Sequence, residues 1–118
     1  MKKLIALSTF ILVFTFSAFA QDAKTVALEQ TKGEFTQKEI KISEGSYVFE
    51  IKNSGVDHEV GFVLAPKSNP KAHIKTAYVT KAVATGKTEK TKVTKLEKGE
   101  YVYFCPLNPT PQYTLVVE

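Results

Sequence analysis

The only cysteine of the chain, Cys105, follows a run of alternating side-chain types, residues 99–104, and this run constrains the fold most strongly. Tyr101 and Tyr103 fall on the same face as Cys105, because successive side chains of a β-strand point to opposite faces. Pro106 then ends the run, since proline has no N–H group to offer a strand ladder. The pattern predicts a strand that delivers one thiol to the start of a proline-rich loop.

Short runs of the same kind recur along the chain, and turn-forming residues separate them. They predict strands over residues 25–29, 35–42, 47–52, 60–64, 87–96 and 113–117. A helical turn or two is expected within residues 72–82, and the strand over residues 87–96 is expected to be exposed. Short alternating strands with turns between them favour a β-sandwich or barrel.

The first 20 residues have the features of a secretory signal peptide. Two lysines precede an apolar run over residues 4–19, and Ala18-Phe19-Ala20 matches a small-x-small cleavage signal. The alternative is an uncleaved anchor, but the run is short for a membrane span, which needs about 20 apolar residues. We therefore expect cleavage after Ala20, a periplasmic or secreted protein, a single domain over residues 21–118, and no membrane span in the mature chain.

Charge and cysteine content narrow the function classes. The mature chain has fourteen lysines, no arginine and twelve acidic residues, a balance that does not favour nucleic-acid binding. One cysteine cannot form an intramolecular disulfide. A lone thiol in an exported protein is buried and inert, paired with another molecule, or bound to a metal, and its spacing leaves these three alternatives open.

Two stretches resemble the cupredoxin family, the plastocyanin and pseudoazurin type of blue copper protein. In the C-terminal stretch the matching residues are Gly99, Tyr101, Tyr103, Phe104 and Cys105. In the N-terminal stretch they are Phe35, Ile40, Ile42, Gly45, Val48, Phe49, Asn53 and His58. The resemblance implies an all-β, cupredoxin-like Greek-key β-sandwich with room for one short helix.

The same resemblance implies a copper site with Cys105 as the thiolate ligand and His58 as an upstream imidazole ligand. A type 1 centre uses two imidazoles, one thiolate and a weak axial sulfur or amide oxygen. The family places a histidine and then a methionine shortly after the cysteine, and this chain has neither. Gln112 lies near the axial position, so the implied ligands are His58, Cys105 and Gln112, with copper as the cofactor.

Each of these residues also has a reading without a metal. Asn108 stands at the spacing of the missing histidine, but its amide is a poor donor to Cu(I), so we expect a turn residue there. Gln112 is either the axial ligand or a rim residue. His73 replaces the missing imidazole only if residues 66–80 fold over the site, and a solvated loop histidine is the favoured alternative. Without a metal, Cys105 is a small buried apolar residue, and His58 is a surface residue bonded to a neighbouring acid.

Three functions remain for such a chain. The first is an exported cupredoxin-like copper-binding protein for electron transfer or copper handling, with a redox or copper-exchange protein as its partner. The second is a cupredoxin-like module without metal that binds a partner through the loop over residues 106–113. The third is a thiol–imidazole nucleophile formed by Cys105 and His58, but no oxyanion-hole motif accompanies it. We therefore do not expect an enzyme, and we expect neither nucleic-acid binding nor a membrane span after signal cleavage.

Overall fold

Nine strands and one short helix make up the fold in a computed structural model that describes residues 23–118. The strands are β1 (Lys24–Thr31), β2 (Glu34–Phe35), β3 (Glu39–Ile42), β4 (Gly45–Asn53), β5 (Val63–Pro66), β6 (Thr88–Lys90), β7 (Thr94–Leu96), β8 (Gly99–Phe104) and β9 (Tyr113–Val117). The helix is the 3-10 turn η1 (Lys75–Ala77). The predicted signal peptide lies outside the described residues.

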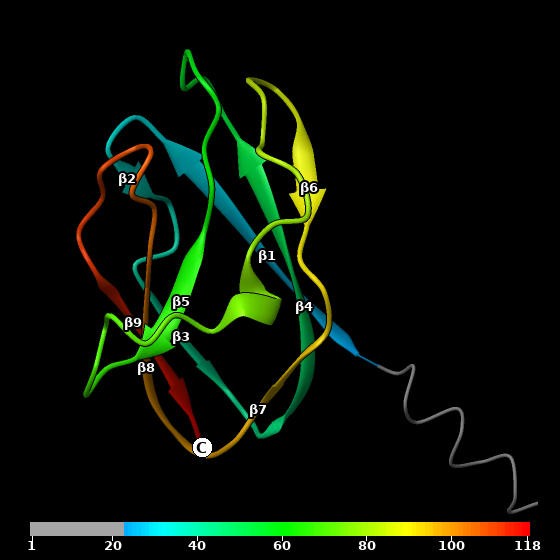
Figure 1. The fold of residues 1–118 in the computed structure, drawn as a ribbon, viewed down its shortest axis with the longest axis vertical. Coiled ribbons are helices and arrows are strands. Elements are labelled where there is room, and N and C mark those ends of the chain that lie inside the picture. Colours follow the sequence, from blue (N-terminus) through cyan, green and yellow to red (C-terminus); the bar gives the residue numbers. More distant parts are fainter. Residues whose placement is uncertain (1–22) are drawn as a thin grey trace, which may run out of the picture.

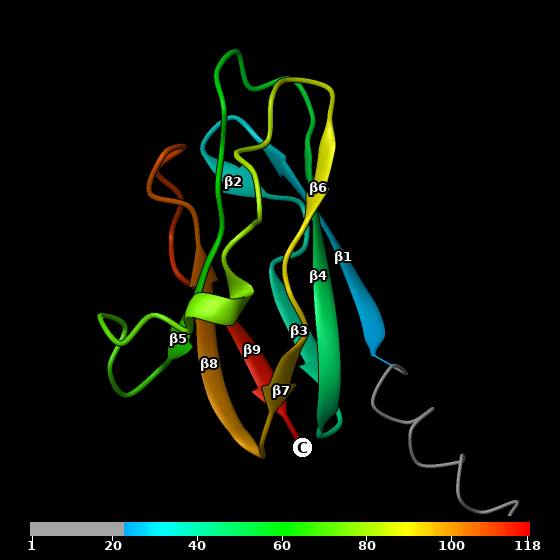
Figure 2. The same ribbon diagram turned by 45° about the vertical axis from the view of Figure 1, so that its right-hand side comes forward.

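The strands form two sheets that face each other as the layers of a sandwich (Figures 1 and 2). The first sheet has the order β2-β1-β4-β6, with β7 also paired to β4, and the second has the order β3-β9-β8-β5. Strands β1 and β4 run parallel, as do β3 and β9, whereas β8 runs antiparallel to both of its neighbours. The predicted all-β sandwich is confirmed, and the cysteine follows an inner strand.

The predicted strand over residues 35–42 is wrong in its continuity, because the chain passes from the first sheet to the second within it. Three residues between β2 and β3 make this crossing and bond to other parts of the chain. The backbone N–H of Thr36 donates to the carbonyl of Glu29, and the carbonyl of Gln37 accepts the hydroxyl of Tyr103 at 2.5 Å. These bonds replace the strand ladder at the crossing.

The predicted strand over residues 87–96 is likewise two strands, β6 and β7, both paired with β4. Between them the buried Thr91 bonds to Phe49 in both directions: its N–H donates to the Phe49 carbonyl at 2.9 Å, and its hydroxyl accepts the Phe49 N–H at 3.0 Å. Thr94 and Leu96 are also buried, so the prediction of an exposed strand was wrong for this half.

One further boundary differs from the predictions. The apolar segment predicted as a strand over residues 60–64 enters the sheet only at Val63, because Val60 instead pairs with Val83 in an isolated bridge. The helical turn expected within residues 72–82 is confirmed as η1, which has three residues. Its turn closes with a hydrogen bond from the N–H of Tyr78 to the carbonyl of Lys75.

Within residues 23–118, no helix is long and apolar enough to span a membrane.

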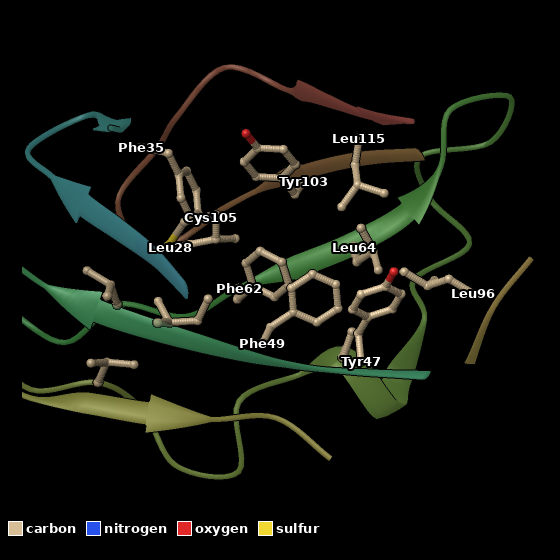
Figure 3. Close-up of a cluster of buried hydrophobic side chains, with 14 of the residues drawn as sticks. Leu28, Phe35, Tyr47, Phe49, Phe62, Leu64, Leu96, Tyr103, Cys105 and Leu115 are labelled. Carbon is tan, nitrogen blue, oxygen red and sulfur yellow. The ribbon is translucent and has the colours of Figure 1, made fainter. Parts of the chain in front are cut away.

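Aromatic side chains dominate the core between the sheets, and Figure 3 shows them together with Cys105. The ring of Phe35 meets the rings of Tyr103 and Phe62 edge to face, with centroids 5.2 Å and 6.0 Å apart. Phe49 lies 5.2 Å from Phe62. Burying such a side chain stabilises the fold by about 2–3 kcal/mol. Because Cys105 belongs to the same buried cluster, its environment is set by core packing.

Several connecting segments gather at one end of the sandwich (Figure 1). They are the β1–β2 turn, the segment that follows β4, the turn that precedes β6 and the loop between β8 and β9. Strand β8 runs toward this end, so Cys105 lies just beneath these segments. The position where the sequence predicts chemistry is therefore the place where four separate parts of the chain meet.

Candidate functional site

The thiol of Cys105 is enclosed rather than presented to solvent, with the residue only 1% exposed. Its Sγ accepts two backbone N–H groups, from Gly61 and from Asn108, each at 3.3 Å. The N–H of Cys105 itself donates to the hydroxyl of Thr110 at 3.0 Å. The sulfur is thus held between the segment that leads into β5 and the loop after β8, the cysteine loop (residues 105–112).

Asn108 is buried, and its side-chain amide bonds to the β1–β2 turn. Its Oδ1 accepts the N–H of Gly33 at 2.7 Å. Its Nδ2 donates to Oε1 of Gln30 at 3.0 Å and to the carbonyl of Thr31 at 2.9 Å. The amide oxygen and both amide N–H groups therefore all have protein partners. Asn108 closes the cysteine loop onto the first hairpin, and the expectation of a residue in a turn holds for its position.

Gln30 completes this polar cluster, and sequence reasoning missed it. The residue is fully buried, and its Nε2 donates to the carbonyl of Gly61 at 2.6 Å. Since the N–H of Gly61 reaches the cysteine sulfur, Gln30 links the two chain segments that flank the thiol. A signal was present in the sequence: Gln30 shares one face of its strand with Leu28, and a polar residue on an inward face requires a buried partner.

Asn53 gives the segment between β4 and β5 its shape. Its Oδ1 accepts the N–H of Val56 at 2.9 Å, and its Nδ2 donates to the carbonyls of His58 and Val83 at 2.9 Å and 3.1 Å. These bonds fix the backbone of the segment from a fully buried side chain. As a result Val60 is buried, while the imidazole of His58 remains on the outside.

The other candidate ligands lie on the surface. The imidazole of His58 is exposed, with Nδ1 2.9 Å from the carbonyl oxygen of Glu59, and Gln112 is exposed on the cysteine loop. Across residues 23–118, no three His, Cys, Asp or Glu side chains gather into a group able to hold a metal ion. The ligand set of His58, Cys105 and Gln112 therefore stays a prediction.

His73 contacts aromatic side chains on the outside of the second sheet. Its Nδ1 lies 2.9 Å from the hydroxyl of Tyr78, and its ring meets that of Phe104 edge to face at 6.0 Å. Side chains of adjacent strand residues point to opposite faces, so a contact with Phe104 is a contact on the face away from Cys105. This position agrees with a loop histidine rather than with a replacement ligand.

A mainly apolar groove of about 320 Å³ runs beside the cysteine loop. Its lining residues come from the segment entering β5, the segment after η1 and the cysteine loop: Val60, Gly61, Phe62, Val63, Tyr78, Val79, Ala82, Pro106 and Leu107. Leu107 and Tyr78 are large side chains that remain 54% and 39% exposed. The groove therefore combines apolar walls with two side chains able to contact another molecule.

The family model of the cupredoxin-like domain matches residues 4–117. The chain belongs to the cupredoxin-like family. This confirms the resemblance seen in the sequence, and with it the family's β-sandwich. Among curated proteins, none matches the chain.

Solved structures of this fold include several blue copper proteins. Auracyanin A, a "blue" copper protein of Chloroflexus aurantiacus, is 19% identical, with a TM-score of 0.63 over 80% of this chain and 98% of its own. Amicyanin of Paracoccus versutus is 19% identical, with a TM-score of 0.55 over 82% of each chain. A methionine-to-glutamine variant of amicyanin in its Cu(I) form is 17% identical, with a TM-score of 0.56 over 80% of this chain and 82% of its own. At these identities the likeness establishes the fold.

Proposed function

We propose that this cupredoxin-like chain is an exported binding module, and that an amide network takes the place of a type 1 copper centre. The observation that carries the proposal is the buried Asn108, whose side-chain amide makes all three of its hydrogen bonds to the end of β1 and the β1–β2 turn. The residue resembles the family's downstream histidine in spacing. A side chain committed to three hydrogen bonds inside the protein is not free to bind an ion.

The rest of the donor set supports the same conclusion. Type 1 copper needs two imidazoles beside the thiolate. The imidazole of His58, the predicted upstream ligand, is exposed, whereas Val60, which directly precedes Gly61, is buried. We infer that the residues present do not fit a type 1 centre. The function that remains for this end of the molecule is recognition of a partner through its apolar surface.

Copper handling is the second candidate function, and one observation favours it. Two backbone N–H groups hold the sulfur of Cys105 in place, and cysteine sulfur is a soft ligand that suits Cu(I). His58 and Gln112 are the residues that would complete such a site. The amicyanin variant with glutamine in place of methionine, which shares this fold, has been solved in a Cu(I) form. A copper-exchange protein outside the cytoplasm would then be the partner.

A copper titration of the mature chain, residues 21–118, tests the proposal. Cu(II) is added while the visible spectrum is recorded, and Cu(I) is added under reductant in competition with a chromophoric chelator. We expect neither an intense thiolate-to-copper band nor retention of Cu(I). The Cys105→Ser variant is the matched control, because it removes the sulfur with little change in volume.

Each alternative result has a distinct meaning. An intense band in the parent chain that Cys105→Ser abolishes would overturn the proposal in favour of a type 1 site. Retention of Cu(I) without colour, lost in Cys105→Ser and weakened in His58→Ala, would establish copper handling instead. Equal weak binding by the parent chain and Cys105→Ser would leave the binding module in place, because the metal would then be held elsewhere.

A further inference from the structure

Charge is distributed unevenly along the chain, and the basic part lies beside the apolar groove. Residues 65–88 contain five lysines and one histidine but no aspartate or glutamate. The rest of the described chain has nine lysines and eleven acids. This acid-free segment, residues 65–88, leaves the second sheet at β5, forms η1 and ends at β6 (Figure 2). This segment is therefore basic, while the remainder of the described chain is slightly acidic.

Most of these lysines have no internal partner. Within residues 23–118 the ion pairs join Lys38 to Glu34, Lys67 to Glu100, and Lys90 to Glu50. Of the five lysines in the acid-free segment, only Lys67 takes part in one. The side chains of Lys75 and Lys81 are exposed. Their charges are therefore available to another molecule.

The groove and the lysines adjoin each other in the fold. Tyr78, Val79 and Ala82 form the groove bank that belongs to the acid-free segment. Lys75 opens η1 immediately before this bank, and Lys81 lies within it. The charged groups closest in sequence to this bank are therefore all cationic, which gives an acidic partner a preferred orientation.

We propose that the groove binds an acidic segment of another protein, with an apolar side chain placed between Tyr78 and Leu107 and with carboxylates facing Lys75 and Lys81. This proposal rests on the binding-module function above and assigns it a partner class. Apolar burial supplies affinity, and the complementary charges supply orientation and a faster encounter. A protein segment is favoured over a membrane surface because the apolar contact lies within a groove of about 320 Å³ between separate chain segments, and a single side chain can fill such a groove whereas a flat lipid surface cannot.

The test uses a fluorescein-labelled peptide in which a central Leu-Phe pair is flanked on each side by three glutamates. Binding to the mature chain is followed by fluorescence polarisation at low and at physiological salt, and its location by backbone amide shifts in NMR. We expect saturable binding, shifts at Gly61, Tyr78 and Ala82, and about tenfold weaker affinity at the higher salt. A peptide with lysines in place of the glutamates should bind at least about tenfold more weakly.

Matched variants separate the contributions. Lys81→Glu should weaken binding about tenfold, because it replaces an attraction with a repulsion. Lys41→Glu is its control, since Lys41 is exposed on β3, at the opposite edge of the second sheet from β5. Leu107→Ser should weaken binding by a similar factor through lost apolar contact. As Leu107 is exposed, this change leaves the core intact.

Three results would overturn the inference: equal binding of the lysine peptide, equal effects of Lys81→Glu and Lys41→Glu, or amide shifts confined to residues outside the groove. Binding to vesicles of phosphatidylglycerol without binding to the peptide would also overturn it, in favour of a lipid surface. None of these results would restore a copper site. Failure of this inference is thus distinguishable from failure of the proposed function, which depends on the copper titration.

Discussion

At the scale of the residue, an asparagine decides the character of the site. Asn108 lies three positions after the cysteine, at the end of a turn that brings its N–H to the sulfur. Its side-chain amide is directed into the protein, where it bonds to the first hairpin, and is not available to an ion. A buried amide of this kind specifies one arrangement of the loop, because every alternative leaves polar groups without partners.

Asn108→Ala should destabilise the fold by about 2–4 kcal/mol, since it leaves the Gly33 N–H and the Gln30 amide oxygen without their partner in a buried place. Urea unfolding followed by circular dichroism measures this loss. Asn69→Ala is the matched control, because Asn69 is exposed and its side-chain Oδ1 accepts a long bond, 3.3 Å, from the N–H of Lys71. Equal midpoints for the two variants would contradict a structural role for the Asn108 amide.

Tyr103 gives the fold a dependence on alkaline pH. Burial, reinforced by the charges of Tyr113 and Glu39, raises the pKa of Tyr103 to about 12. An unfolded tyrosine ionises near pH 10. The unfolded state therefore loses its proton first, so the stability that this group contributes is complete below about pH 10 and is lost as the pH rises toward 12.

Tyr103→Phe should accordingly flatten the fall in stability between about pH 10 and 12, because phenylalanine cannot ionise. It should also lower stability at neutral pH, since the Tyr103 hydroxyl donates to the Gln37 carbonyl. Urea midpoints at pH 7, 10 and 11.5 measure both effects. Tyr101→Phe is the control, because it removes the same group at an exposed place, where the hydroxyl of Tyr101 donates to the carbonyl of Glu97.

At the scale of the element, the site depends on the turn between β1 and β2. Gly33 adopts a φ of +75°, a left-handed conformation that only glycine adopts without strain, and its N–H meets the amide of Asn108. Gly61, on the segment entering β5, has no such requirement. A Cβ atom there would lie 3.7 Å from Cδ1 of Leu107, an ordinary contact distance.

Gly33→Ala should therefore cost about 1–2 kcal/mol of stability, and the cost should come from the backbone alone, because no atom lies within 4 Å of the added Cβ. Gly61→Ala should be close to neutral. Thermal unfolding of the two variants side by side measures the difference. A larger loss in Gly61→Ala than in Gly33→Ala would mean that the groove wall is tighter than its geometry indicates.

At the scale of the whole molecule, one continuous core encloses the thiol. Cys105 belongs to the same cluster of buried side chains as residues from both sheets. Access to its sulfur therefore requires the cysteine loop to open, or the sandwich to unfold. For a small domain the free energy of such opening reaches several kcal/mol.

The thiol should consequently react with Ellman's reagent at least about 10³-fold more slowly in the native chain than in urea. The chain has a single cysteine, so absorbance reports this group alone. Asn108→Ala should speed the reaction, because it releases the cysteine loop from the β1–β2 turn. Leu107→Ser, a change at an exposed position of the same loop, should not. Rapid labelling of the parent chain would show that the sulfur is more accessible than its burial indicates.

The strands were predictable wherever one face of a run is buried and the other is not. Strand β4 and strand β9 follow the expected runs closely, because side-chain period two reflects one buried face. The predictions failed where a run continues through a change of sheet, as at Gln37, or where a polar side chain takes over a ladder bond, as at Thr91. The alternation of buried and exposed side chains along a strand predicts neither event.

The sequence by itself determined the β-sandwich, the family and the strand that carries Cys105, because these depend on periodicity and on residues close together in the chain. Only the tertiary structure decided what surrounds the sulfur. Gln30, Gly61 and Asn108 are distant in sequence, and their bonds exist only once the two sheets have packed. The same packing places the lysine-rich segment along an apolar groove. The inward-facing position of Gln30 indicates that it needs a buried partner, but only the fold shows that its partners are Gly61 and Asn108, because a local pattern does not specify which distant residues will meet.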